Sequence, residues 1–360
     1  SWLPGEEPLD CVAPELECWR TRLEALPVVG RPGQLRPLVL DDHDRLYLHR
    51  FWEYERRLAD QWRRRASASV SSGEAGRLRA GIERHFGPPS PGVVNWQKVA
   101  ACAIFGSALV VLARGPKTGK TRTAVAVLAL LLEENPRLRA MLAAPTGKAA
   151  ARLKETLDRT RSALACAEEI RSRLPAEAVT IHRLLGARPD SPRFRHDARR
   201  PLELDLLVVD EASMVDLALM AKLMDALPDT ARLILVGDPD QLAPVEAGHV
   251  FGDLCRATPP NALSAGFRAR CAAMTGEVLP PEPAAATKAA PAVPLTDRFI
   301  RLERNFRFGE GSGIGQLSRA IRDGDAARVG ETLAAAAPAA GVAGADLEWR
   351  ELPSAAHLRQ

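Results

Sequence analysis

A short loop that ends in Gly-Lys-Thr, placed between an apolar run and a helix-forming run, constrains this chain more than any other stretch. The apolar run covers residues 108–113, the loop covers 114–121, and helical character follows over 123–132. A strand, a tight turn and a helix in this order are the layout of a nucleotide phosphate-binding loop. Lys120 stands where a lysine reaches the β- and γ-phosphates, and Thr121 stands where a hydroxyl holds Mg²⁺. The other residues that we expect to surround the phosphates are Gly115, Pro116, Lys117, Thr118 and Gly119, all of which except the proline can offer a backbone N–H group.

The loop departs from the usual pattern at its first position. The pattern G-x-x-x-x-G-K-[ST] requires glycine where this chain has Arg114. Taken alone, the stretch is also compatible with an ordinary strand, turn and helix that bind no ligand. The nucleotide site is favoured because other apolar runs in the chain end in residues that suit the same chemistry.

The most telling of these runs covers residues 204–211 and ends in two carboxylates, Asp210 and Glu211. A continuous apolar run predicts a buried parallel strand, and ligands bind at the carboxyl ends of such strands. Asp210 at that end can hold Mg²⁺ through water, and Glu211 can polarise the attacking water. The alternative is a strand that ends in solvated acids. Two acids in a chain with a nucleotide loop favour the catalytic interpretation.

Further apolar runs lead to polar residues of related character. Residues 231–236 precede Gly237, which permits a sharp exit from the strand, and Gln241, which can bond the γ-phosphate or the attacking water. Residues 139–144 precede Pro145, Thr146, Gly147 and Lys148, which suit a nucleic-acid phosphate through hydroxyl, backbone N–H and charge. Residues 180–186 form a shorter helical piece of the same type, with Thr180 and His182 as DNA-binding candidates, although a lone histidine is more often structural.

The order of these blocks resembles that of the motifs in superfamily 1 DNA helicases. The residues within the blocks are similar to those of the RecD family, the alpha chain of exodeoxyribonuclease V. The resemblance covers residues 36–325. It rests on blocks at 95–100, 115–121, 144–153, 180–186, 208–216, 235–248 and 302–315. RecD-like phosphate loops usually carry glycine at the positions of Arg114 and Lys117, and a side chain there costs about 1–3 kcal/mol where it strains the backbone.

The resemblance implies an α/β fold: a RecA-like P-loop NTPase lobe with a parallel sheet and flanking helices, preceded by a small, mostly helical N-terminal domain. It implies ATP and Mg²⁺ as cofactors, adenine recognition by Gln97 and a γ-phosphate contact by Arg307, which is otherwise an ordinary surface arginine. It also implies 5′-to-3′ DNA unwinding, single-stranded DNA as a ligand, and RecB-like and RecC-like partner subunits in double-strand break repair and recombination.

The chain divides into three parts. We expect residues 1–90 to be an N-terminal domain with a hairpin over 37–48 and a helix over 51–65. It either docks a RecC-like partner or packs on the motor as a small satellite domain. Residues 91–308 form the ATPase and helicase lobe, in which the Pro- and Ala-rich segment 258–296 is expected to be a mobile loop. Residues 309–360 start a linker to an absent second lobe, because no Thr-x-His-Lys-Ser-Gln-Gly or Thr-Arg-Ala block follows.

Composition fits this interpretation. A net charge of +4 permits nucleic-acid binding without demonstrating it, and no stretch has the length and apolarity of a membrane span. The six cysteines are scattered, which indicates reduced thiols in a cytoplasmic protein. Two alternatives stay open. One is a P-loop ATPase that acts on RNA or protein, and the other is a structural subunit whose altered phosphate loop no longer hydrolyses ATP.

Overall fold

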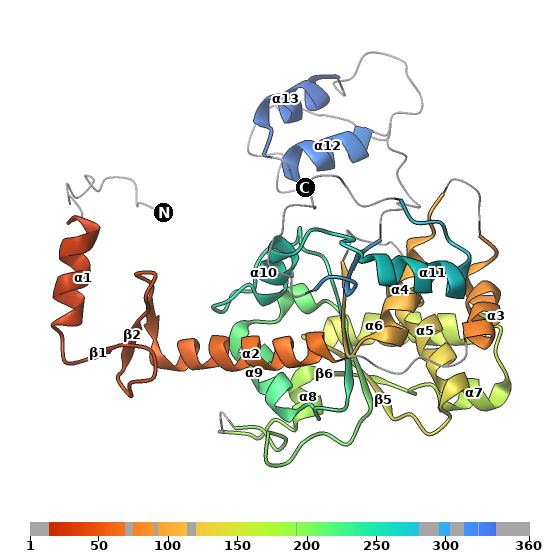
Figure 1. Cartoon of the computed structure of the whole chain (residues 1–360), viewed down its shortest axis with the longest axis horizontal. Coiled ribbons are helices and arrows are strands. Elements are labelled where there is room, and N and C mark those ends of the chain that lie inside the picture. Colours follow the sequence, from red (N-terminus) through yellow and green to blue (C-terminus); the bar gives the residue numbers. More distant parts are fainter. Residues whose placement is uncertain are drawn as a thin grey trace, which may run out of the picture.

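A six-stranded parallel sheet organises the structure, a computed structural model that describes residues 14–68, 75–89, 93–113, 120–191, 193–280, 295–302, 313–322 and 324–335 (Figure 1). Its strand order is β6-β5-β7-β8-β4-β9. The strands are β4 (Leu109–Ala113), β5 (Ala140–Ala144), β6 (Ala178–Thr180), β7 (Leu206–Val209), β8 (Arg232–Gly237) and β9 (Phe299–Arg301). The apolar runs predicted as buried strands are therefore strands of one parallel sheet. The two remaining strands, β6 and β9, have three residues each and are too short to be recognised from the sequence.

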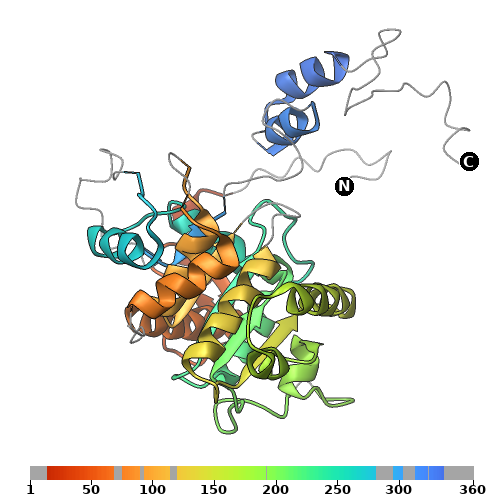
Figure 2. The same cartoon turned by 90° about the vertical axis from the view of Figure 1, so that its right-hand side faces the viewer.

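Helices connect the strands and cover both faces of the sheet, as predicted (Figure 2). They are α4 (Trp96–Gly106), α5 (Lys120–Glu134), α6 (Gly147–Ala163), α7 (Glu168–Arg173), α8 (Ile181–Leu185), the 3₁₀ helix η1 (Ala212–Met214), α9 (Leu217–Ala226), α10 (Val250–Ala257) and α11 (Ala265–Thr275). Successive side chains of a strand point to opposite faces. In β4, Val110 and Leu112 accordingly belong to one core, whereas Leu109, Val111 and Ala113 belong to the other.

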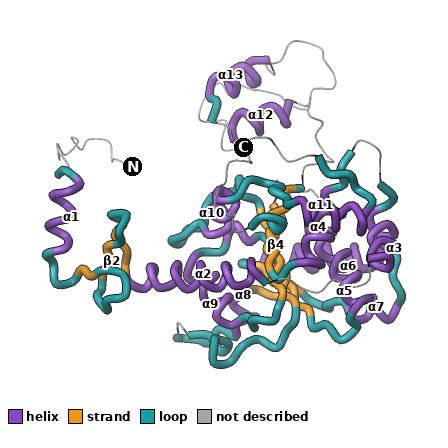
Figure 3. The backbone as a smooth tube through the Cα atoms, viewed as in Figure 1, coloured by secondary structure: helices purple, strands orange, loops and turns teal. Residues whose placement is uncertain are grey.

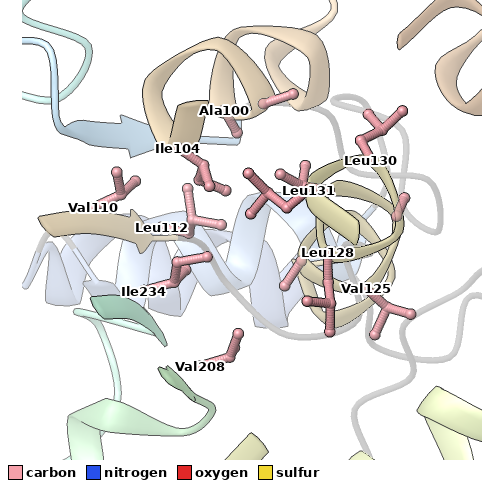
Figure 4. Packing of buried hydrophobic residues seen from close by; sticks show 14 of the residues in the cluster. Ala100, Ile104, Val110, Leu112, Val125, Leu128, Leu130, Leu131, Val208 and Ile234 are labelled. Carbon is pink, nitrogen blue, oxygen red and sulfur yellow. The ribbon is translucent and has the colours of Figure 1, made fainter. Parts of the chain in front are cut away.

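The two cores explain which helix lies on which face. Buried side chains of α3, α4, α5, α6 and α11 form the first core, and Figure 4 shows α4 and α5 residues such as Ile104 and Leu128 beside Leu112. Buried side chains of α2, α8, α9 and α10 form the second core. A sheet covered on both faces consists of strands that are apolar throughout, and all five residues of β4 are buried.

The N-terminal residues form a small sheet and three helices. The elements are α1 (Leu16–Glu24), β1 (Val29–Gly30), β2 (Leu38–Leu40), β3 (Leu46–Leu48), α2 (His49–Ser67) and α3 (Ala75–Phe86). The predicted hairpin is β2 and β3, which pair antiparallel, and its acidic turn is closed by Asp41, whose carboxylate accepts hydrogen bonds from the backbone N–H groups of His43 and Arg45. The predicted helix over 51–65 is also present as α2.

The packing of α2 and α3 does not coincide with the domain boundary expected at residue 90. Leu58 of α2 lies in one core of the lobe, and Leu78 and Ile82 of α3 lie in the other. In Figure 3, α2 runs from the small sheet to the body of the large sheet, where it packs against α9. Among the described residues up to the end of α3, those before α2 are therefore the ones that contribute to neither core.

The loop predicted over residues 258–296 contains a helix, and for residues 265–275 the prediction is wrong. These residues form α11, which buries Phe267, Cys271 and Met274 against α3 and α4. Because the segment around the helix is rich in proline and alanine, its composition does not reveal the apolar face of the helix. Residues 281–294 lie outside the described part of the chain.

Beyond β9, the helices α12 (Gly313–Arg322) and α13 (Ala326–Ala335) contact each other. Within the described ranges, every helix is too short or too polar to span a bilayer.

Candidate nucleotide-binding site

Three strand ends meet where the sequence predicts the nucleotide. In the sheet order, β8 lies between β7 and β4, so the segments that follow these three strands leave the same edge side by side. Helix α5 begins at Lys120, directly after the loop that follows β4. The loop itself, with Gly115, Pro116, Lys117, Thr118 and Gly119, lies outside the described residues. Arg307 also lies outside them, so neither prediction meets a structural observation.

Thr121 and Asp210 are brought together by a direct hydrogen bond. The Thr121 hydroxyl donates to Asp210 Oδ2 at 2.9 Å, which joins the first turn of α5 to the end of β7. These two residues are 89 positions apart in the chain. A hydroxyl and a carboxylate are oxygen donors of the kind that Mg²⁺ accepts, and Mg²⁺ commonly takes its remaining ligands from water and phosphate. The pair predicted to hold the metal therefore fits it by donor chemistry.

No cluster of three or more His, Cys, Asp or Glu side chains that could hold a metal occurs among the described residues.

Glu211 occupies a backbone conformation that is rare for a residue with a side chain. Its φ is 53° and its ψ is 39°, which places it in the left-handed region. This conformation turns the chain from β7 into η1, and the Glu211 N–H donates to Asp210 Oδ1 at 2.9 Å. Strained backbone of this kind costs about 1–3 kcal/mol and occurs most often at functional sites. The turn directs Asp210 and Glu211 to different partners.

Gln241 links Glu211 to a serine that the sequence analysis does not single out. Gln241 Nε2 donates to Glu211 Oε2 at 3.3 Å, and Gln241 Oε1 accepts from the Ser213 hydroxyl at 2.9 Å. Both groups of the amide are used, so its orientation is determined. Ser213 is fully buried in η1. Its position two residues after the paired acids is the sequence signal that could have identified it.

Gly237 has a different role from the predicted one. Its φ is not positive, so no turn at this position requires glycine. A Cβ atom there would lie 2.7 Å from the ring of Phe251 on α10. The residue is therefore glycine because an aromatic ring packs against its backbone, and that ring belongs to the core under the end of β8.

Gln97 lies at the start of α4, near the first turn of α5. Its side-chain Nε2 donates to the hydroxyl of Thr123 at 3.0 Å. Asn95 caps α4, because its side-chain oxygen accepts from the Gln97 N–H at 3.1 Å. The residue predicted to recognise adenine is thus attached to the helix that follows the phosphate loop.

The predicted DNA-binding residues gather at neighbouring strand ends. Ala144 of β5 is the register partner of Thr180, the last residue of β6. Thr146 and Thr180 are the N-caps of α6 and α8, where their hydroxyls accept from the backbone N–H groups of Ala149 and Arg183. Both hydroxyls therefore have a structural role that the sequence analysis did not predict.

The rest of this group is presented at the surface. Gly147 and Lys148 are exposed in the first turn of α6, and Pro145 is half-buried before it. His182 is exposed on α8, and its ring packs edge-on against Phe194 at 5.7 Å between centroids. The structure therefore places these predicted residues in one region at the ends of β5 and β6, apart from the ends of β4 and β8.

Comparisons with known proteins identify the family of this chain. A family profile described as AAA domain matches residues 97–247. The RecBCD enzyme subunit RecD of Mycolicibacterium smegmatis is 38% identical over 354 residues, which are 96% of this chain and 53% of that protein. The same subunit of Haemophilus influenzae is 35% identical over 307 residues, which cover 82% of this chain and 45% of that protein.

This chain belongs to the RecD family. It spans about half the length of the curated RecD relatives it matches. The crystal structure of Pif1 helicase from Candida albicans aligns with a TM-score of 0.38 and 18% identity, over 68% of this chain and 48% of that one.

Proposed function

We propose that this RecD-family chain carries the ATP-binding lobe of a 5′-to-3′ DNA helicase subunit. The subunit would act within a RecBCD-type helicase and nuclease complex in double-strand break repair and recombination. The observation that carries the proposal is that hydrogen bonds of 2.9 and 3.3 Å join Thr121 to Asp210 and Gln241 to Glu211 at one edge of the sheet. A cytoplasmic location is part of the proposal, and the cysteines among the described residues are free thiols.

The residues divide the chemistry between them. Thr121 and Asp210 would hold Mg²⁺, while Lys120 and the backbone N–H groups of residues 115 and 117–121 would bind the phosphates. Glu211 would accept a proton from the attacking water. Gln241 would contact that water and transmit its displacement to β8, the strand that Gln241 follows. When ATP and Mg²⁺ are bound, phosphoryl transfer supplies the free energy for unwinding. Arg307 would contact the γ-phosphate.

DNA would bind at the ends of β5 and β6. Thr146, Gly147, Lys148, Thr180 and His182 lie there, and the segment that follows α8 adds exposed arginines at 188, 193, 195, 199 and 200. Positive charge and backbone N–H groups at a helix start suit phosphates. Because β5 is next to β7, this surface is one strand away from the paired acids. A structural change at Asp210 and Glu211 can therefore be transmitted to the DNA-binding residues through β5, the strand next to β7.

The test of the ATP site uses the complete subunit and two lysine substitutions. Lys120→Ala is expected to remove DNA-stimulated ATP hydrolysis while thermal unfolding stays unchanged. Lys154→Ala is the control, since Lys154 is an exposed residue of α6 that pairs with Asp158. Wild-type turnover in the Lys120 variant would overturn the site. If RNA or protein rather than DNA stimulates ATP hydrolysis, the chain is better explained as an ATPase that acts on RNA or protein. If the wild-type complex shows no ATP hydrolysis that depends on this subunit, it is better explained as a structural subunit.

We also propose that the N-terminal module of residues 14–48 docks a RecC-like subunit. Seven of its large apolar residues are exposed: Leu16, Trp19, Leu26, Val28, Leu35, Leu46 and Leu48. Leu46 and Leu48 alternate along β3, so they lie on one face of an edge strand. An exposed apolar group of this kind marks an interaction surface.

The docking test uses substitutions, because deletion of residues 36–65 would remove Leu58 and Arg65, which are buried in the lobe. Leu46→Glu with Leu48→Glu is expected to abolish co-purification with a RecC-like subunit and to leave DNA-stimulated ATP hydrolysis by the isolated subunit unchanged. Ile321→Glu, another exposed apolar residue outside the module, is the control. Retained assembly of the double variant would count against docking.

A further inference from the structure

A buried ion pair joins the first turn of α4 to the segment that follows α11. Lys98 Nζ lies 3.1 Å from Glu277 Oε1, and the two side chains are 0% and 2% exposed. Neither Lys98 Nζ nor Glu277 Oε1 forms a hydrogen bond with any other described residue. A buried pair of this kind is weak evidence for stability, because desolvation offsets the attraction between the charges. Its position in the fold indicates another role.

The second oxygen of the same carboxylate binds the residue that starts α4. Glu277 Oε2 accepts from the Asn95 backbone N–H at 3.0 Å. One carboxylate therefore holds both Asn95 and Lys98, which are the neighbours of Gln97 on the first helical turn. Asn95 in turn accepts from the Gln97 N–H. Gln97 is thus fixed from both sides by a residue 180 positions away in the chain.

Glu277 is itself held in place by the end of α11. The helix ends at Gly276, whose φ is 70°, and the chain turns there so that the next side chain points back to α4. The Glu277 N–H donates to the Thr275 hydroxyl at 3.1 Å, and that hydroxyl donates to the Cys271 carbonyl at 2.6 Å. The carboxylate is therefore positioned by a rigid, buried helix end.

We propose that Glu277 is a positioning residue for base recognition: through Asn95 and Lys98 it sets the place of Gln97, and so the preference of the site for adenine nucleotides over guanine nucleotides. The inference rests on the proposed function and on the adenine contact that the resemblance to RecD implies for Gln97. The side chain of Gln97 is oriented from the opposite side by Thr123 of α5. Movement of the α4 turn would break the alignment between the base contact and the helix that follows the phosphate loop.

The test compares two double variants that remove the ion pair without leaving a lone buried charge. Lys98→Met with Glu277→Leu removes the charges and the acceptor for the Asn95 N–H. Lys98→Met with Glu277→Gln removes the charges but keeps an acceptor. Replacement of a buried pair by apolar groups of similar size is often neutral for stability, so thermal unfolding should stay close to that of the wild type. Gln97→Ala provides the reference for loss of the base contact.

The readout is equilibrium binding of N-methylanthraniloyl ATP and of the matching GTP derivative to the full chain without DNA. Gln97→Ala should weaken ATP binding about threefold to tenfold, the size of one net hydrogen bond, and leave GTP binding unchanged. The double variant with Glu277→Leu should lose as much ATP affinity as Gln97→Ala. The double variant with Glu277→Gln should keep the wild-type ratio of ATP affinity to GTP affinity. Hydrogen exchange of the Asn95 amide in nucleotide-free protein should speed up in the leucine variant and not in the glutamine variant.

Two outcomes separate this inference from the proposed function. If Gln97→Ala loses the preference and the leucine double variant keeps it, Glu277 does not position Gln97, while the ATP site stands. If Gln97→Ala keeps the preference, Gln97 does not contact the base, and the inference falls together with that contact. Should the leucine variant fail to fold, Glu277→Asp withdraws the carboxylate by one methylene with the charge kept. An unchanged ratio in that variant would also overturn the inference.

Discussion

At the residue scale, the candidate site depends on side chains that follow different strands and bind one another. Gln241 is the clearest case, since its amide oxygen and nitrogen are bound by Ser213 and Glu211 respectively. The amide has one orientation, because reversing it would place its oxygen against the Glu211 carboxylate and so bring two acceptors together. Glu211 is thereby held by a residue of the segment that follows another strand, β8.

Glu211→Gln tests the assigned base. The substitution keeps the size of the side chain and its ability to accept from Gln241, but removes the charge that takes up a proton. We expect ATP binding to persist and turnover to fall by about a hundredfold or more, the range of a positioned general base. Equilibrium nucleotide binding and steady-state hydrolysis measure the two effects. Glu203→Gln is the control, because this exposed acid precedes the opposite end of β7. Lost binding without a selective effect on turnover would contradict the role.

Ser213→Ala tests whether the orientation of Gln241 matters. Loss of one hydrogen bond should lower DNA-stimulated turnover about threefold to tenfold, with little change in the KM for ATP. The combination of Ser213→Ala and Gln241→Ala should be no worse than Gln241→Ala alone, since the serine acts through the glutamine. Additive losses in the double variant would show that Ser213 acts by another route.

At the element scale, α2 joins the N-terminal sheet to the lobe. Arg57 and Gln61 bind the two oxygens of Asp225 on α9, each at 2.8 Å. One turn further on, Arg65 is buried and donates to the carbonyl oxygens of Leu227, Pro228, Asp229 and Ala231, in the turn between α9 and β8. Burial also lowers the pKa of the Arg65 guanidinium. The end of α2 is therefore bound to the turn that precedes β8, the strand that Gln241 follows.

Arg65→Ala should destabilise the lobe because it leaves buried carbonyl oxygens without donors. Each unsatisfied group costs about 1–3 kcal/mol, so we expect the free energy of unfolding to fall by about 3 kcal/mol or more. Denaturant unfolding measures this change. Arg64→Ala is the matched control, because the adjacent Arg64 is exposed and its loss should change stability by about 0.5 kcal/mol or less. Equal effects of the two variants would show that the carbonyl contacts contribute little.

At the scale of the whole molecule, stability rests on two cores that share one sheet, and a half-buried histidine next to the first core makes that stability depend on pH. Burial, with a smaller contribution from the Arg84 charge, lowers the pKa of His85 on α3 from 6.5 to about 4. In the described residues, its Nε2 has no hydrogen-bond partner that would favour the charged form.

The sign of this pH dependence follows from the lowered pKa. Above pH 6.5 the histidine is neutral in both states, and its contribution to stability is fully present. Below pH 6.5 only the unfolded chain takes up the proton, so stability falls until about pH 4. His85→Asn should reduce the change of the unfolding midpoint with pH between about 4 and 6.5. His43→Asn, at an exposed turn, should leave that pH dependence as it is in the wild type. A midpoint in the wild type that is constant over the same window would contradict the assignment.

Much of the fold could be predicted because its signals are local. Continuous apolar runs identified β4, β5, β7 and β8, since a strand buried on both faces has no polar alternation. The Gly-Lys-Thr loop and the acid pair Asp210 and Glu211 follow these runs directly. The carboxyl ends of parallel strands share one edge, so their meeting was also predictable. Helix α11 was missed because alanine and proline surround its few apolar residues.

By itself, the sequence determined the strands β4, β5, β7 and β8 and the residues that follow β5, β7 and β8, because each of these depends on neighbours within a few positions. The tertiary structure alone decided which of those residues touch. The place of β8 between β7 and β4 brings Gln241 to Glu211 and Ser213, and the return of α11 to α4 brings Glu277 to Lys98. The physical reason is that contacts over 30 to 180 positions depend on strand order and side-chain packing, which local periodicity does not contain.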